Sequence, residues 1–265
     1  MAKPIVLNDT LRAEYLHLFY SCQVNPERYK EINRHAQTII TNKARYETVV
    51  KGTKTPWYFV GLVHLMEAGF KFDRHLHNGD PLSARTVNVP AGRPKTGHAP
   101  FTWEHSANDA LTMTGVLSVA DWQLSSLLYQ IEAYNGFGYR RRSPKINSPY
   151  LWSYSNNYTK GKYVKDGVFD PEAVSKQPGA VTVLKRLVEL GAVSFPSPTA
   201  LERLVYLGTI VPYAPNKVNE KGRELQKVLN LLGANLREDG KIGPKSAQAY
   251  TARTGDYLAG DPAKP

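Results

Sequence analysis

The sequence predicts a mainly α-helical protein with long irregular loops, and three observations lead to this fold class. Helix-start signals, in which a capping residue precedes proline, recur along the 265-residue chain. Residues 57–66 are almost entirely apolar, which is typical of a buried helix, and the run is too short to span a membrane. Long segments rich in Gly, Pro and Asn separate the helices. Loops of such length are functional or contain short strands, so we allow for a small β excursion.

The first two helices can be placed from these signals. Asn25-Pro26-Glu27 offers a cap, a proline and an early acid, and it predicts a helix that runs to about Val50. Thr55-Pro56 begins the apolar helix, which we expect to be buried on every face.

The later signals continue the same pattern. Asp121 caps a third helix with apolar residues at helical spacing. Asp170-Pro171-Glu172 and Ser197-Pro198 repeat the helix-start signal. The irregular segments occupy residues 70–101 and 136–167.

Composition limits the class of partner. The chain carries 34 Lys and Arg against 23 Asp and Glu, a net charge of +11. Such an excess favours an extended anionic partner, which could be nucleic acid, a membrane surface or the cell-wall polymer. The single cysteine, Cys22, excludes an internal disulfide framework and a multi-thiolate zinc site, and we expect it to be a core residue. The N-terminal sequence lacks the features of a secretory signal.

Proline and asparagine also suggest the domain boundaries. Prolines lie close together near residues 194–198, and prolines and asparagines together near 212–219. The predicted organisation is therefore a main domain at 1–195, a connecting helix and linker at 196–218, and a helical module at 219–265.

Two carboxylates stand out as candidate catalytic groups. Glu67 ends the apolar helix, one residue before a predicted stop at Ala68-Gly69. A carboxyl against apolar surface is hard to ionise and suits a general acid. Asp80 lies in a Gly/Pro turn, where an ionised carboxylate is expected. One raised acid and one ordinary carboxylate across a cleft is the arrangement that glycoside hydrolysis needs, although a solvated helix end and a simple turn former are the alternative.

The segment that contains Glu67, His-Leu-Met-Glu-Ala-Gly-Phe, resembles the catalytic segment of the goose-type lysozymes and lytic transglycosylases. Asp80 follows Glu67 by thirteen residues, like the acidic cleft residue of goose-type lysozymes, and Thr86 follows Asp80 by six, as in phage-type lysozymes. Further on, Ala133-Tyr134-Asn135 is similar to the Ala-Tyr-Asn-x-Gly signature of the same groove, although Gly136 comes directly after Asn135.

The resemblance implies a lysozyme-like fold and a role for each of these residues. Glu67 is then the general acid, Asp80 activates water or supports positive charge, and Thr86 positions that water. The expected substrate-binding residues are Tyr134, Asn135, Gly136, Tyr139, Trp152 and Tyr154.

The C-terminal region resembles a small peptidoglycan-binding domain. The motifs on which this resemblance rests are Leu225-Gln226 with Val228-Leu229, and Asp239-Gly240 followed by Ile242-Gly243. The leucines form one helix face, and Asp-Gly makes a tight turn. The closing segment of that family is missing, and Tyr250 and Tyr257 are candidates to replace it. A helical pair that only packs on the main domain is the alternative interpretation.

A group of histidines and a basic, aromatic stretch are two further patterns that could indicate binding sites. His64, His75 and His77 lie near Asp73 and Asp80, but no His-Glu-x-x-His helix accompanies them, so we expect hydrogen-bonded or surface histidines and no metal. The stretch Arg140–Lys165 carries seven Lys and Arg, interleaved with tyrosines and Trp152. This composition suits single-stranded nucleic acid, and it equally suits a glycan groove, which the neighbouring signature favours.

These observations predict a peptidoglycan hydrolase of the lysozyme superfamily, similar to bacteriophage endolysins, that cleaves the bond between N-acetylmuramic acid and N-acetylglucosamine. It would need no cofactor, bind peptidoglycan rather than specific nucleic acid, have no membrane span and act as a monomer. We expect it to stay in the host cytoplasm until it is released to the cell wall. A lytic transglycosylase, which uses the acid alone, and a non-catalytic wall-binding or phage structural protein remain alternatives.

Overall fold

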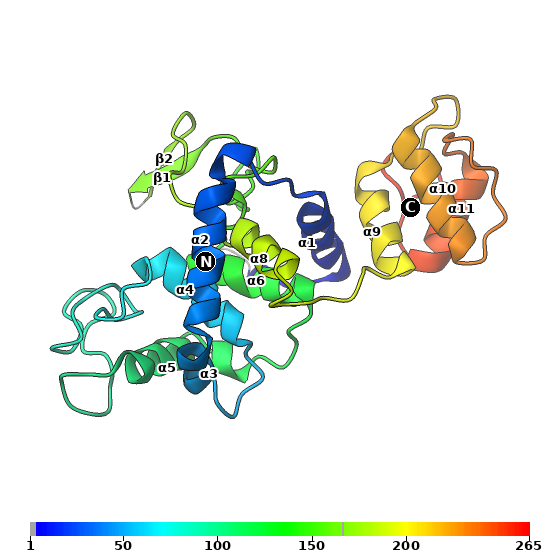
Figure 1. The fold of residues 1–265 in the computed structure, drawn as a ribbon. Helices are drawn as coiled ribbons and strands as arrows, with labels where there is room; N and C mark the ends of the chain where they lie inside the picture. The colour runs from blue at the N-terminus through cyan, green and yellow to red at the C-terminus, as the bar shows by residue number, and fades with distance from the viewer. Residues whose placement is uncertain (1–3, 166) are drawn as a thin grey trace. The chain divides into compact units, whose positions relative to one another are not determined.

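The structure, a computed structural model, describes residues 4–165 and 167–265, and over these residues it is mainly helical, as predicted. The first six α-helices are α1 (Asp9–Ser21), α2 (Tyr29–Thr41), α3 (Lys43–Val49), α4 (Trp57–Ala68), α5 (Trp103–Met113) and α6 (Leu124–Asn135). They are followed by α7 (Pro149–Trp152), α8 (Ala180–Glu189), α9 (Ala200–Ile210), α10 (Glu220–Leu231) and α11 (Pro244–Thr254). Two short antiparallel strands, β1 (Lys162–Lys165) and β2 (Val168–Asp170), form a hairpin that confirms the small β excursion (Figure 1).

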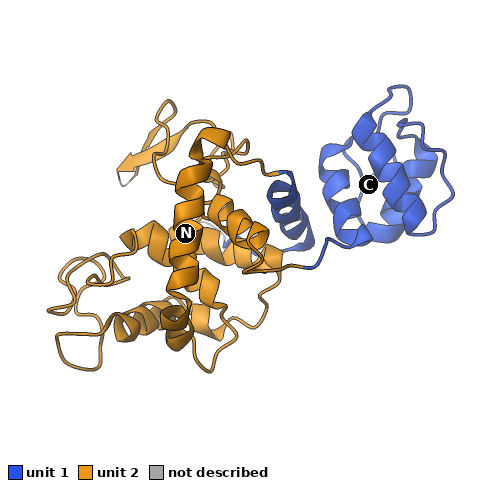
Figure 2. Ribbon diagram, in the orientation of Figure 1, with its two compact units in different colours: residues 1–21, 196–265 blue, residues 22–195 orange. Residues whose placement is uncertain are grey.

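The chain divides into two compact units (Figure 2). Unit 2 is continuous and comprises residues 22–195, whereas unit 1 combines residues 1–21 with residues 196–265. The predicted boundary at 195 therefore agrees with the division, but two parts of the prediction do not. Residues 1–21 group with the C-terminal region, and residues 196–218, predicted as a connecting helix and linker, belong to the C-terminal unit, with α9 as the predicted helix.

Helix α4 is the central element of unit 2. It packs against α2, α3, α6 and α8, and residues 59–65 are all buried. The approach of α2 is so close that a Cβ atom at Gly61 would lie 2.7 Å from Ile39 Cγ2, so this position requires glycine. Burial on every side explains the almost uniformly apolar sequence of α4, and it fixes the helix that carries Glu67.

The helix predicted from Pro26 to Val50 is interrupted. A 3₁₀ turn at Pro26–Arg28 precedes α2, and α2 and α3 are separated at Asn42. The Asn42 side chain donates a hydrogen bond to the Thr38 carbonyl at 2.8 Å. Asparagine competes in this way for backbone groups that a continuous helix would use, which accounts for the break.

The predicted helix start at Asp170-Pro171-Glu172 is wrong. Asp170 ends β2, and its Oδ1 accepts hydrogen bonds from the Glu172 and Ala173 amides at 2.8 and 3.2 Å. The same Asp-Pro chemistry that caps helices also closes a turn after a strand. The next helix, α8, begins only at Ala180.

The helices α9, α10 and α11 of unit 1 share a small apolar core. Its members are Leu204, Leu207, Val211, Leu225, Val228, Leu229, Ile242, Ala247, Tyr250 and Leu258. Helix α9 begins with a capping box, in which Thr199 and Glu202 satisfy each other's backbone amides, so the cap lies one residue after the predicted Ser197-Pro198. Helix α1 packs against α9, with the rings of His17 and Tyr206 stacked at 3.6 Å.

Candidate active site around Glu67

Glu67 lies in the last turn of α4, where the helix ends at Gly69 in the left-handed conformation (φ 55°). Glu67 is exposed, although the preceding two turns of the helix are buried. Left-handed backbone of this kind is accessible to glycine at little cost, so Gly69 ends the helix directly after the acid. The buried part of α4 therefore holds the Glu67 backbone, and the carboxyl projects from its end.

Two tyrosines surround the Glu67 carboxyl. Tyr150, at the start of the short helix α7, donates its hydroxyl proton to Glu67 Oε1 at 2.7 Å. Tyr134, near the end of α6, lies close enough that the charge of Glu67, after burial, contributes to raising its pKa. Burial and then Glu67 also raise the pKa of Tyr150. Both hydroxyls therefore remain protonated hydrogen-bond donors at neutral pH.

The surroundings of Glu67 favour its protonated form. Desolvation by the surrounding protein raises the pKa of the carboxyl, and the hydrogen bond from Tyr150 acts in the opposite direction without reversing the shift. The carboxyl also lies at the C-terminal end of a helix, where the helix dipole disfavours negative charge. An accessible carboxyl whose pKa is raised holds its proton to higher pH than an ordinary glutamate does, which suits it to act as a general acid.

A buried ion pair fixes the chain next to Tyr134. Glu132 of α6 and Arg140 contact each other at 2.7 Å, with 3% and 11% of their side chains exposed. Between them, Gly136 has φ 86° and ends α6. Asn135 is exposed at this end of the helix. In the Ala133-Tyr134-Asn135 segment, Tyr134 thus lies beside Glu67, while Asn135 and Gly136 form the turn that follows α6.

Three other predicted substrate-binding residues belong to the core of unit 2. Trp152 is 1% exposed. The hydroxyl of Tyr139 accepts from the Tyr163 amide at 3.1 Å, and that of Tyr154 donates to the Lys176 carbonyl at 2.5 Å. Their side chains offer little free surface for a sugar ring, so the structure lends no support to the predicted substrate-binding role. Alternation of aromatic and basic residues did not distinguish packing from binding at these positions.

Tyr150 was missing from the predicted site. Its one sequence signal is its position after Pro149, at the first turn of a helix within the aromatic-rich stretch. Nothing in the sequence distinguishes it from Tyr154, because the contact with Glu67 joins residues 83 positions apart.

Asp80 lies in the loop that follows α4, and its carboxylate stabilises that loop through hydrogen bonds. Its carboxylate accepts hydrogen bonds from the amides of Val87 and Asn88 at 2.8 and 3.0 Å. The side chains of Asn78 and Asn88 donate two more, at 3.1 and 2.6 Å. These bonds, that of the Asn88 amide first, lower the pKa of Asp80. Within the described residues its hydrogen bonds connect it to this loop and not to Glu67, so the predicted pairing of the two carboxylates gains no support.

Thr86 is likewise engaged within its own loop. Its hydroxyl donates to the Pro90 carbonyl at 2.5 Å and accepts from the Arg93 amide at 2.9 Å. The residue is 3% exposed. A hydroxyl that is buried and bonded in both directions is poorly placed to position a substrate water.

The three histidines have protein partners. His64 contacts the Tyr46 hydroxyl and the Lys71 carbonyl, each at 3.2 Å, and burial lowers its pKa to about 4. His75 contacts Ser106 Oγ at 2.7 Å, and His77 contacts Asp109 at 2.8 Å. In the part of the chain that the structure describes, no group of three or more His, Cys, Asp or Glu could hold a metal ion. Cys22 is 4% exposed, as expected for a core residue.

The basic stretch is partly neutralised within unit 2. Arg140 pairs with Glu132, and Lys160 contacts Glu172 at 2.7 Å. The Arg142 guanidinium lies over the Phe169 ring at 3.4 Å. These contacts reduce the number of cations that an anionic partner could meet.

The C-terminal motifs form one connected structure in unit 1. Gln226 of α10 is 2% exposed and donates to Asp239 Oδ1, the Lys241 carbonyl and Ser246 Oγ at 3.1, 3.1 and 3.3 Å. Its Oε1 accepts from the Gly240 amide at 2.8 Å, and Gly240 has φ 76°. Tyr250 is buried in the core of this unit, and Tyr257 lines a surface pocket.

Comparisons with protein-family models, with curated proteins and with solved structures returned no match. Among the described residues, no helix combines the length and the apolar character that a membrane crossing needs.

Proposed function

We propose that this protein cleaves the β-1,4 bond between N-acetylmuramic acid and N-acetylglucosamine in peptidoglycan, as a member of the lysozyme superfamily, with Glu67 as the general acid. The observation that carries the proposal is the environment of Glu67. Its carboxyl is accessible, has a raised pKa and is held by Tyr150, within a segment that resembles the catalytic segment of goose-type lysozymes.

The proposed reaction begins with the proton of the Glu67 carboxyl. Glu67 donates it to the glycosidic oxygen while the bond to the sugar C1 breaks and positive charge develops on the ring. Glu67 leaves this step as a carboxylate, and the hydroxyl of Tyr150 then stabilises its new negative charge. In a hydrolase, a water adds to C1 and its proton returns to a carboxylate.

A second reaction at the same residue is favoured by the state of Asp80. Among the described residues, the Asp80 carboxylate accepts four hydrogen bonds, all from its own loop. A carboxylate engaged in this way has little remaining capacity to activate a water. A lytic transglycosylase needs the acid alone, because the C6 hydroxyl of the muramic acid attacks C1 and yields an anhydro sugar. Mass spectrometry of digested peptidoglycan separates the two, since the anhydro product is lighter by one water molecule.

The C-terminal module, here defined as residues 196–265, is proposed to bind the cell wall. The support is the resemblance of its Leu-Gln and Asp-Gly motifs to a peptidoglycan-binding domain. Even weak binding raises the concentration of substrate that a tethered catalytic unit meets.

The deciding experiment replaces Glu67 by Gln in the full chain and measures clearing of purified peptidoglycan. General acid catalysis contributes about 10²–10⁴-fold, so the expected loss is at least about 100-fold. Glu47→Gln, at an exposed acid on α3, is the matched control and should clear normally. A Glu67→Gln protein that retains more than about half of the activity would refute the assignment.

Two non-enzymatic readings have their own signatures. A folded wild-type protein that gives no clearing in a zymogram would indicate a wall-binding or structural component. A steeply salt-dependent affinity for DNA oligomers would indicate a nucleic-acid-binding protein.

A further inference from the structure

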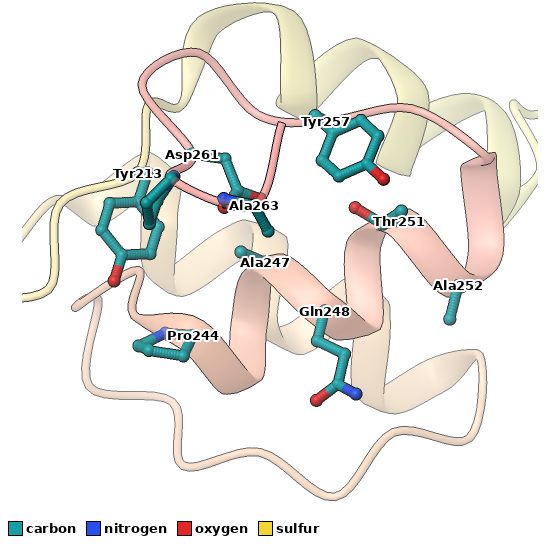
Figure 3. A pocket seen from close by; sticks show the side chains of 10 residues that line it. Tyr213, Pro244, Ala247, Gln248, Thr251, Ala252, Tyr257, Asp261 and Ala263 are labelled. Carbon is teal, nitrogen blue, oxygen red and sulfur yellow. Dashed lines mark hydrogen bonds between the residues drawn. The ribbon is translucent and has the colours of Figure 1, made fainter. Parts of the chain in front are cut away.

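The C-terminal module contains a pocket of about 520 Å³ beside α11 (Figure 3). One wall is the face of α11 that carries Ala247, Thr251 and Ala252, and the opposite wall is the C-terminal tail. The small side chains on this helix face leave the space between helix and tail unfilled. A volume of this size falls within the range of ligand sites in proteins.

The pocket is built before any ligand arrives. Leu258 is fully buried in the module core and anchors the tail. The Tyr213 amide donates to the Ala259 carbonyl at 2.9 Å, and the Lys264 amide donates to the Asp261 carbonyl at 3.1 Å. A ligand would therefore not have to order this segment, which removes a large part of the entropic cost of binding.

The charge of the pocket is opposite to that of the chain. Of the described residues that line it, Asp261 alone is charged, and none is Lys, Arg or His. The whole protein carries a net charge of +11. A ligand carboxylate would meet a like charge here, whereas a cation would meet its complement.

Asp261 has capacity for such a cation. The residue is 8% exposed, and within the described chain its carboxylate accepts one hydrogen bond, from the Ala263 amide at 3.0 Å. A carboxylate offers about four acceptor positions, so most of its capacity is unused.

Aromatic side chains complete the recognition surface. In the view of Figure 3, Asp261 lies between the rings of Tyr213 and Tyr257, with Gln248 at the rim. Tyrosine rings attract ammonium groups through their faces, and they also cover the aliphatic stem that carries such a group. The shape and chemistry thus fit a primary ammonium at the end of an alkyl chain.

We propose that this pocket binds the ω-ammonium group of a diamino-acid side chain, with Asp261 as its counter-ion. The source of this ammonium group is identified from the proposed function, on which this step rests. The ligand is then a cell-wall stem peptide whose ω-amine is still free. That amine is consumed when stem peptides are cross-linked. The module therefore selects regions of the wall that are not cross-linked.

The direct test titrates the full chain with Nα-acetyl-lysine N-methylamide and follows binding by NMR. Saturable binding with a Kd below about 10 mM is expected, with the shifts confined to the pocket. The Nε-acetylated compound should bind at least about tenfold more weakly, because it has lost the charge. Glucosamine, whose ammonium group is attached to a sugar ring, should also be weaker. Equal binding of the charged and acetylated compounds, or no binding, overturns the proposal.

Asp261→Asn isolates the charge. Asparagine retains an oxygen that can accept from the Ala263 amide, so the turn is preserved while the negative charge is removed. The expected effect is a loss of affinity for the lysine derivative of about tenfold or more. Asp256→Asn removes the same charge from an exposed position of the same module and should leave affinity unchanged. An Asp261→Asn protein with unchanged affinity contradicts the role of Asp261.

Purified sacculi supply the second test. Acetylation of their free amines makes the wall more anionic, so non-specific attraction to a basic protein becomes stronger. The proposal predicts the opposite, a weaker attachment of the wild-type protein and a smaller change for Asp261→Asn. Unchanged or tighter attachment to acetylated sacculi, together with normal clearing of untreated peptidoglycan, refutes the ligand while the proposed function stands. Absence of clearing would refute the enzyme, and the titration would still decide the pocket.

Discussion

A single hydrogen bond opposes the effect of desolvation on the pKa of Glu67, the candidate acid. The Tyr150 hydroxyl donates to Glu67 and stabilises its charged form, whereas desolvation by the surrounding protein stabilises the neutral form and has the larger effect on the pKa. The two effects oppose each other on one carboxyl. The pH at which Glu67 loses its proton therefore depends on whether this donor is present.

Tyr150→Phe removes the donor and leaves the ring. The pKa of Glu67 is then expected to rise further, because its ionised form loses a partner. In a pH–activity profile, the alkaline limb should move to higher pH, while activity at the optimum falls because the carboxyl is held less firmly. Tyr163→Phe is the control, since its ring packs against Tyr139 and Phe169. A limb that moves to lower pH would contradict this assignment.

His64 makes the stability of unit 2 sensitive to acid. Burial lowers its pKa to about 4, from an ordinary value of 6.5. The unfolded chain therefore binds a proton that the folded chain does not, in the window between these values. Stability is fully present above pH 6.5 and is lost as the pH falls toward 4, by up to about 3 kcal/mol.

Thermal unfolding of the wild type and of His64→Gln between pH 7 and pH 4.5 tests this expectation. Glutamine can keep one hydrogen bond but cannot titrate, so the variant should be less stable at pH 7 and should depend less on pH. The exposed His98 supplies the control substitution, His98→Gln. Parallel curves for His64→Gln and the wild type would exclude His64 as the source.

At the scale of elements, the loop after α4 is held by side chains rather than by secondary structure. The carboxylate of Asp80 binds two backbone amides, and the hydroxyl of Thr86 bridges Pro90 and Arg93. The exposed tip carries Val87 and Val89, which are 78% and 90% exposed. This loop is therefore ordered although its tip has little packing of its own.

Asp80→Asn should loosen this loop. The amide group of asparagine has one acceptor oxygen in place of two and adds donors that face the Val87 and Asn88 amides. Hydrogen exchange at these two amides is expected to become faster, with little change in the helices. Asp73→Asn, at an exposed neighbouring acid, should leave the exchange rates unchanged. Unaltered exchange in Asp80→Asn would mean that the carboxylate does not hold the loop.

The elements that were predicted from sequence are those set by local chemistry and by apolar patterning. The buried helix ending at Glu67, the mainly helical class and the Leu-Gln helix of the module depend on residues close together in the chain. The predicted helix start at Asp170 was wrong because a carboxylate that closes a turn has the same neighbours in sequence as one that begins a helix. Asp80 also caps a turn, and its sequence neighbours do not distinguish such a position from one that faces a cleft. Tyr150 and the pocket at Asp261 require contacts between distant segments, which a local pattern does not contain.

At the scale of the molecule, the extent of the C-terminal module decides where the chain can be divided. Leu204 and Leu207 of α9 belong to the core that Leu225 and Val228 complete. A division after Val211 separates these residues, although proline and asparagine make that region resemble a linker.

A chain that ends at Val211 is therefore expected to expose the apolar face of α9. Increased binding of a hydrophobic dye and aggregation on size-exclusion chromatography would reveal this exposure, together with weaker attachment to sacculi. The full chain is the reference for all three measurements. A truncated protein that stays monomeric, binds no more dye and attaches normally would show that α9 does not depend on α10 and α11.

The grouping of α1 with α9 determines an order of events during synthesis. Helix α1 leaves the ribosome before unit 2, yet the helix against which it packs begins at Ala200. The stacking of His17 on Tyr206 and the bond from the Tyr20 hydroxyl to the Pro196 carbonyl can form only after the whole of unit 2 has been made. Because domains generally fold as units during translation, unit 2 can be complete before α1 acquires this partner. Helix α1 is thus synthesised before all of unit 2 and reaches its contacts with α9 only after unit 2 is complete.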